Sequence, residues 1–118
     1  MIGLFYFATV SAYIKDPSTT KVIAGTEVPV DIELQCNYFG IPNPGVHWQK
    51  DGQRLDIGNR LTIASGDSSP AQNLEQSILK IKEPRLEDSG SYTCEIHNDV
   101  PGLFSSVDRK DFVVTIQG

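Results

Sequence analysis

The sequence predicts an all-β protein, an antiparallel sandwich or barrel, from three observations. Apolar and polar residues alternate over residues 27–36, with a period of two that is typical of a strand with one buried face. Shorter stretches of the same kind follow, separated by Gly- and Pro-rich turns about every ten residues. No window keeps apolar residues at the spacing of a helix, so we expect helices of single turns at most.

The clearest strand is expected at residues 27–36. Its inward face would carry Val28, Val30, Ile32, Leu34 and Cys36. Pro29 lies on the outward face near the start, where a missing amide is tolerated. Five further strands are expected at residues 46–50, 60–63, 76–81, 91–98 and 110–117, with a flexible loop over residues 65–71.

Length and composition restrict the classes of protein. A chain of 118 residues, 39% hydrophobic and 21% charged, has room for one domain and enough apolar material for its core. A net charge of −5 disfavours nucleic acid as a partner, because phosphates would be repelled. No apolar run reaches the roughly 18–20 residues that span a bilayer, so direct membrane insertion is not expected.

The first twelve residues have two interpretations. They are uncharged and apolar and end in Val-Ser-Ala, the small-residue pattern of a signal peptidase site, so they resemble the end of a secretory signal. Alternatively, they form a first strand with an apolar extension. We divide the chain into this segment, 1–12, and a single domain, 13–118. If the segment is retained, its aromatic and aliphatic residues, Leu4 to Phe7, must pack on something or drive self-association.

Several motifs identify a family. Cys36, Trp48 and Cys94 occur in the order and spacing of an immunoglobulin sandwich, with Tyr92 two residues before the second cysteine. The motifs GIPNPGVHW at 40–48, KDGQRL at 50–55, LKI at 79–81 and EDSGSYTC at 87–94 agree. Over residues 14–117 the chain resembles the I-set branch of the immunoglobulin superfamily. This resemblance implies a two-sheet antiparallel Greek-key sandwich.

The resemblance also implies structural roles for particular residues. Cys36 and Cys94, the two cysteines of the chain, would form one disulfide joining the sheets, with Trp48 packed against it. Leu79 and Tyr92 would belong to the same core. Arg60 and Asp88 match the family's ion pair at the bottom of the sandwich. Ile96 stands where the family often has a smaller residue, which is a variation in packing.

The sequence gives no indication of catalysis or of a cofactor. It lacks a nucleophile elbow and a phosphate-binding glycine loop, and the resemblance places both cysteines in the core. We therefore expect no enzymatic activity, no cofactor and no metal.

The two histidines are candidates for a site on the sheet formed by strands 46–50, 91–98 and 110–117, which correspond to strands C, F and G of the family. Alternation places His47 and His97 on its outer face, here called the C–F–G face. The family register would set His47 opposite His97 and Gln49 opposite Glu95. Two adjacent imidazoles would share a metal ion or repel each other when protonated; the alternative is a pair of surface histidines without a special role.

The F–G loop, residues 98–106, is the second candidate surface. Hairpin tips usually expose polar residues, but this one has a Pro-Gly turn surrounded by apolar side chains: Val100, Pro101, Leu103 and Phe104. Exposed apolar groups on a rigid scaffold are typical anchors of a protein interface. The alternative is that Leu103 or Phe104 folds back over the core.

Two functions are compatible with these observations. The first is a non-catalytic extracellular recognition or adhesion module, in a secreted or cell-surface protein, that binds a protein partner. That partner would be a different protein or a second copy, with the C–F–G face or the N-terminal segment as surfaces for a homodimer. The second is a structural link of an intracellular filament or muscle protein, whose thiols would normally be reduced.

Overall fold

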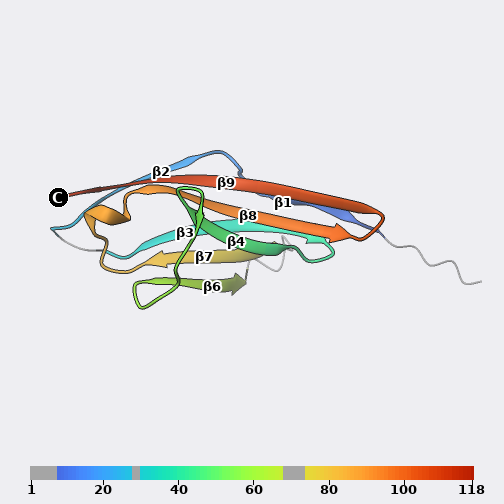
Figure 1. The fold of residues 1–118 in the computed structure, drawn as a ribbon, viewed down its shortest axis with the longest axis horizontal. Helices are drawn as coiled ribbons and strands as arrows, with labels where there is room; N and C mark the ends of the chain where they lie inside the picture. The colour runs from blue at the N-terminus through green and yellow to red at the C-terminus, as the bar shows by residue number, and fades with distance from the viewer. Residues whose placement is uncertain (1–7, 28–29, 68–73) are drawn as a thin grey trace, which may run out of the picture.

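The computed structural model describes residues 8–27, 30–67 and 74–118, which form two facing β-sheets (Figure 1). The first sheet has the order β1-β3-β7-β6: Val10–Ile14, Ile32–Ile41, Glu75–Ile81 and Leu61–Asp67. The second has the order β2-β9-β8-β4-β5: Thr20–Gly25, Phe104–Gln117, Gly90–Val100, Gly45–Lys50 and Gln53–Arg54. A single 3-10 turn, η1, covers Leu86–Asp88. The predicted immunoglobulin-like sandwich is confirmed.

The start of the chain contributes to both sheets. Strand β1 pairs antiparallel with β3, and after a short connection β2 pairs in parallel with β9 of the other sheet. The other described pairings are antiparallel. The N-terminal strands therefore close one side of the sandwich.

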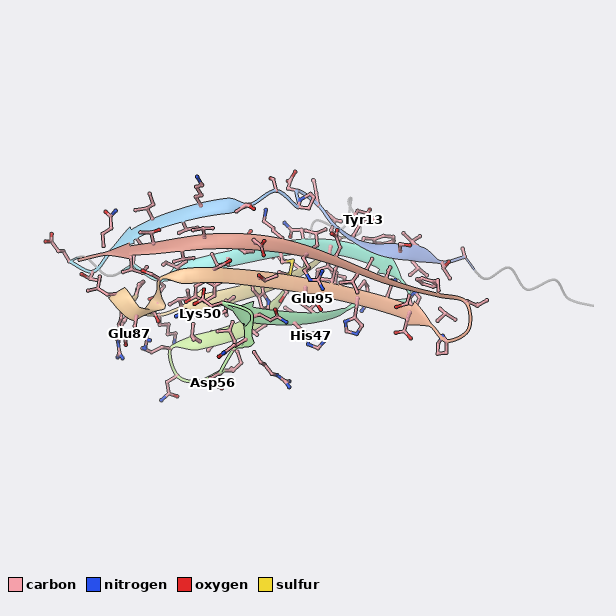
Figure 2. All side chains as sticks on the ribbon, turned by 45° about the horizontal axis from the view of Figure 1, so that its top comes forward. Tyr13, His47, Lys50, Asp56, Glu87 and Glu95 are labelled. Carbon is pink, nitrogen blue, oxygen red and sulfur yellow. A yellow bond between two sulfur atoms is a disulfide. The ribbon has the colours of Figure 1, made fainter. Side chains whose placement is uncertain are left out.

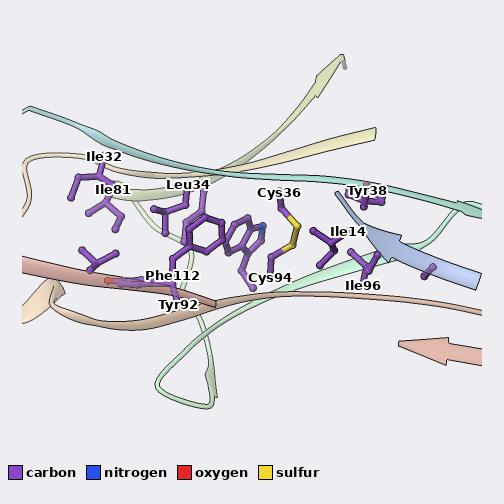
Figure 3. Close-up of a cluster of buried hydrophobic side chains, with 14 of the residues drawn as sticks. Ile14, Ile32, Leu34, Cys36, Tyr38, Ile81, Tyr92, Cys94, Ile96 and Phe112 are labelled. Carbon is purple, nitrogen blue, oxygen red and sulfur yellow. A yellow bond between two sulfur atoms is a disulfide. The ribbon is translucent and has the colours of Figure 1, made fainter. Parts of the chain in front are cut away.

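The disulfide lies in the centre of the core. Cys36 on β3 and Cys94 on β8 are bonded, with their Cα atoms 6.5 Å apart, as the resemblance implied. Figure 3 shows Leu34 and Phe112 on one side of this bond and Ile14 and Ile96 on the other. Leu79, Tyr92 and Ile96 are completely buried, and Trp48 is 3% exposed. The Trp48 indole donates a hydrogen bond of 2.9 Å to Ser77 Oγ, so its one polar atom is satisfied inside the core.

The predicted strand at 27–36 is wrong in its bounds. Strand β3 begins at Ile32, which lies opposite Ile81, the last residue of β7. Val30 lies beyond this end of the ladder and is 68% exposed, although alternation predicted an inward side chain. Alternation could not reveal that the partner strand ends here. The predictions for Val28 and Pro29 lie outside the described residues.

Strands β8 and β9 form a longer hairpin than predicted. They pair continuously from Gly90↔Val114 to Val100↔Phe104, whereas the sequence predicted segments 91–98 and 110–117. The extension was missed because two successive inward positions of β9, Ser106 and Asp108, are polar, which interrupts the apolar period there. Strand β6 likewise reaches Asp67, so residues 65–67 are not the loop that was predicted, and residues 68–71 lie outside the described part.

Inward polar side chains of β8 and β9 attach β1 and the connection after it to the second sheet. The Ala12 amide donates to Asn98 Oδ1 (3.0 Å) and to Ser106 Oγ (2.8 Å), and the Ile14 amide donates to Asp108 Oδ2 (2.8 Å). The buried Lys110 ammonium donates to two carbonyl oxygens of the connection after β1, on Asp16 (2.7 Å) and Ser18 (2.8 Å). These hydrogen bonds replace a backbone ladder along this edge of β1.

The folded domain includes residues that the sequence assigned to the N-terminal segment. Strand β1 begins at Val10, and Ala12 is buried in the core. Residues 10–12 thus belong to the sandwich, and a cleavage after Ala12 would remove three of the five residues of β1. The apolar residues Leu4 to Phe7 lie outside the described residues.

Asn98 is expected to be essential for holding β1. Its amide group also donates 2.9 Å hydrogen bonds to the carbonyl oxygens of Val10 and Pro42. Asn98→Ala leaves these buried groups unsatisfied, so we expect a loss of about 2–3 kcal/mol in the free energy of unfolding. Urea unfolding measures the loss, and hydrogen exchange should show faster opening at Ala12. Asn59→Ala, at an exposed position, is the control; equal stability of the two variants would contradict this role.

Candidate protein-binding surface

The C–F–G face is the outer face of β4, β8 and β9, and its register differs from the predicted one. Trp48 lies directly opposite Cys94, which sets His47 opposite Glu95, Gln49 opposite Thr93 and Gly45 opposite His97. The predicted pairs, His47 with His97 and Gln49 with Glu95, are therefore wrong by two residues. The outward orientation is unaffected, since a shift of two residues leaves every side chain on the same face.

The two imidazoles are nevertheless neighbours, diagonally across β4 and β8. The His47 and His97 rings are stacked, with centroids 5.1 Å apart and planes inclined by 1°. The nitrogen lone pairs lie in these parallel planes, so in this geometry they do not converge on one ion. The residues that the structure describes also contain no group of three or more His, Cys, Asp or Glu side chains that could hold a metal. The stacked imidazoles are thus a feature of the surface of β4 and β8.

The rest of this face carries charged and polar side chains together with two exposed valines, Val107 and Val113. Glu95 accepts a 2.7 Å hydrogen bond from Arg109 Nε, and Thr93 Oγ1 donates one of 2.7 Å to Asp111. Figure 2 shows Glu95 and His47 close together on the side of the sandwich that carries β8 and β4. Gln49 is half-buried. The predicted contact residues of this face therefore share one surface, on which Glu95 is already paired with Arg109.

The F–G hairpin ends in a tight, well-defined turn. The Leu103 amide donates a 2.8 Å hydrogen bond to the Val100 carbonyl oxygen, with Pro101 and Gly102 at the central positions. Gly102 has a φ of 79°, a left-handed conformation that favours glycine at this place in a type II turn. The turn thus presents Leu103 in a fixed position.

The apolar residues of the hairpin tip differ in exposure. Leu103 is 72% exposed, so the interpretation in which it folds back over the core is wrong. Pro101 is also exposed, and Val100 and Phe104 are half-buried. Neither Leu103 nor Phe104 belongs to the side chains packed against the core cluster. The hairpin tip therefore presents one large exposed aliphatic side chain, Leu103, on a rigid turn.

The opposite end of the molecule has a structural role. The Arg60 guanidinium donates to both carboxylate oxygens of Asp88, at 2.9 and 3.0 Å, and the Arg85 amide donates to Asp88 Oδ2 at 2.7 Å. The Tyr92 hydroxyl donates to the Asp88 carbonyl oxygen. Figure 1 places η1, which contains Asp88, at the end of the sandwich remote from the F–G turn. This cluster closes the sandwich and does not contribute to the candidate surface.

The pKa values in this cluster follow from its contacts. Burial alone would raise the pKa of the Asp88 carboxyl, but the hydrogen bonds from Arg60 and Arg85 outweigh it and hold the pKa below its usual value. Burial, with the nearby charge of Asp88, raises the pKa of the Tyr92 hydroxyl well above its usual value. Asp88 therefore stays ionised and Tyr92 stays neutral at physiological pH.

One surface feature was missed by the sequence analysis. A groove of about 300 Å³ opens between β4 and β5 of one sheet and β6 of the other, and we call it the β4–β6 groove. Its lining consists of Val46, His47, Trp48, Gln49, Arg54, Leu55, Ile57 and Ile63. Ile57 and Ile63 are exposed. A signal was present, since Leu55 and Ile57 follow the Asp-Gly turn at period two, but only the fold brings them beside Ile63 and Trp48.

No helix in the described ranges is long and apolar enough to cross a membrane.

Comparison with known proteins establishes the family. A model of the immunoglobulin domain matches residues 14–98, which is most of the chain and includes both cysteines, Trp48 and Tyr92. The sandwich and its central disulfide agree with this match. The chain belongs to the immunoglobulin domain family.

The relatives of known function are long proteins of two kinds. The chain is 32% identical over 93 residues to the muscle M-line assembly protein unc-89 of Caenorhabditis elegans. It is 31% identical over 94 residues to human contactin-2. These matches cover 77% and 78% of the chain, but only 1% of unc-89 and 8% of contactin-2. The family thus includes adhesion and muscle proteins.

Among solved structures, the titin M3 domain has a similar fold. The TM-score is 0.73 at 20% sequence identity, and the alignment covers 93% of this chain and 100% of the titin domain. This similarity concerns the fold alone.

Proposed function

We propose that the chain is a non-catalytic I-set immunoglobulin module of a secreted or cell-surface protein, which binds a protein partner through its F–G hairpin and the adjoining C–F–G face. The observation that carries the proposal is the exposure of Leu103 on the rigid Val100–Leu103 turn. Large exposed aliphatic groups at fixed positions are typical anchors of interfaces. The match with contactin-2, an adhesion protein, supports this class of function.

The disulfide supports an extracellular location. Cys36 and Cys94 are bonded in the core, and such bonds persist in oxidising compartments and are rare in the cytosol. The I-set assignment rests on the sequence motifs around Trp48 and Cys94. The absence of enzymatic activity is part of the proposal, and the immunoglobulin relatives support it, because they are adhesion or structural proteins.

A structural link in an intracellular filament is the second candidate. The match with unc-89, a muscle assembly protein, favours it. In that case the thiols would be reduced, and the ends of the domain would carry the function instead of the F–G hairpin.

Replacing Leu103 should separate recognition from folding. An artificially tetramerised form of the protein is tested for binding to a panel of purified ectodomains of cell-surface proteins. The Leu103→Ser substitution is expected to weaken any specific binding at least about tenfold. The matched control is Ile23→Ser, because Ile23 is equally exposed (69% against 72%) but lies on β2. Equal binding by the two variants would contradict a role for the hairpin.

A further inference from the structure

Two exposed apolar features of the molecule carry charges of opposite sign. One is the hairpin tip, defined as Val100–Phe104, and the other is the β4–β6 groove. We infer that the tip of one molecule inserts into the groove of a second copy, so that molecules join head to tail. This inference rests on the proposed role of the F–G hairpin and names a second copy of the chain as its partner.

The groove offers an apolar surface that water covers in the isolated molecule. Five of its eight lining residues are apolar: Val46, Trp48, Leu55, Ile57 and Ile63. Trp48 is almost completely buried, whereas Ile57 and Ile63 are exposed. A volume of about 300 Å³ accommodates a branched aliphatic side chain. Filling the groove would remove apolar surface from water on both partners, which is the main driving force of association.

The hairpin tip is narrow and has a fixed conformation, which are the properties that insertion into a groove requires. The last pair between β4 and β8 is Gly45↔His97, so residues 98–100 are flanked in their sheet only by β9. The tip is thus a narrow two-stranded ribbon that ends in Leu103. Its turn is fixed by the hydrogen bond from Leu103 to Val100 and by Pro101. A preformed turn loses little conformational entropy on binding.

The charges of the two features are complementary. Arg54 and His47 line the groove, and a carboxylate is absent from the lining. Residues 98–106 contain one acidic residue, Asp99, and no basic residue. Asp99 and Arg54 are both exposed, and neither has an ion-pair partner among the residues that the structure describes. Asp99 beside an inserted Leu103 would meet a groove of opposite charge, although each whole molecule carries −5.

The contact must form between molecules. The β4 residues of the groove pair with Thr93 to Ile96 of β8, away from the turn at the end of the hairpin. Figure 1 shows the turn between β8 and β9 at one end of the long axis, and the segment that connects β4 to β6 nearer the middle. A tip therefore cannot reach its own groove. Because tip and groove are different surfaces, the contact is heterologous, and repeated contacts produce open chains of molecules unless the rotation between neighbours closes a ring.

Complementation between two variants tests this arrangement directly. Leu103→Ser disables the tip and leaves the groove intact, whereas Ile57→Ser disables the groove and leaves the tip intact. Both substitutions are at exposed positions, so both proteins should fold, and thermal unfolding verifies this. One tip buries much less than the roughly 1,200 Å² of a stable interface, so association is measured by sedimentation equilibrium up to high protein concentration.

The expected pattern has three parts. The mass of the wild-type protein rises continuously with concentration, each variant alone keeps the mass of one chain, and the equimolar mixture rises to the mass of two chains and stops. A wild-type protein that stays at one chain would overturn the inference. So would variants that associate like the wild type, because another surface would then be responsible, or a mixture that forms no dimer. Binding to foreign ectodomains in the tetramer screen would still support the proposed function after any of these failures.

Discussion

Replacing both cysteines by alanine is expected to lower the free energy of unfolding by about 4 kcal/mol, since the disulfide restricts the unfolded chain. The bond joins residues separated by 58 positions, and a loop of this length removes much conformational freedom from the unfolded state. A domain of this size is typically stabilised by about 5–15 kcal/mol, so the loss is a large part of the total. Urea unfolding of Cys36→Ala/Cys94→Ala measures it.

The wild-type protein with and without reductant is the control for this experiment. Reduction removes the bond but keeps the two sulfur atoms in the core. The reduced wild type should therefore lose most of the stability that the double variant loses, and any difference reports the packing of the sulfur atoms. Coincident urea midpoints of the oxidised protein, the reduced protein and the variant would contradict a stabilising role of the bond.

Asp88→Asn is expected to lower the free energy of unfolding by about 3 kcal/mol. The substitution keeps the shape of the side chain but leaves the Arg60 guanidinium without its counter-charge, and breaking a buried ion pair costs about 3–5 kcal/mol. Arg60 is one quarter exposed, so we expect the lower end of this range. Glu87→Gln is the matched control, because Glu87 is an exposed neighbour whose contact with Arg85 is 3.8 Å long, and it should change stability by less than about 0.5 kcal/mol.

The pH dependence of this loss follows from the pKa of Asp88. Its folded-state pKa lies below the unfolded value of 3.8, so ionised Asp88 stabilises the folded state. This contribution is complete above the unfolded pKa and is lost as the pH falls through the lower folded pKa. The difference in stability between the wild type and Asp88→Asn should thus be constant near neutral pH and shrink in acid below pH 3.8. A difference that grows in acid would contradict the ion pair.

The core was predictable from the sequence because its signals are local or belong to the family. The positions of Cys36, Trp48, Tyr92 and Cys94 sufficed to expect the sandwich, and the structure contains the bond between the cysteines. The ion pair of Arg60 and Asp88 is also present. These residues occupy positions that the family motifs define, so their spacing along the chain predicted them.

The missed features depend on contacts between distant segments. Asn98, Ser106 and Asp108 point inward but bond to β1, which lies more than 80 residues earlier in the chain, so no local period reveals them. The register of β4 on β8 was wrong because alternation fixes the face of a residue and not its partner. The β4–β6 groove is formed by residues from both sheets, and its existence follows only from their packing.

The proposal of an extracellular recognition module is tested most directly by the mass of the intact protein purified from its natural source under thiol-blocking conditions. An extracellular module should yield a chain with no blocked cysteine, lighter than the reduced chain by the two hydrogens lost when Cys36 and Cys94 form their bond. A mass showing that both cysteines carry the blocking group would contradict the extracellular module and favour the intracellular filament link.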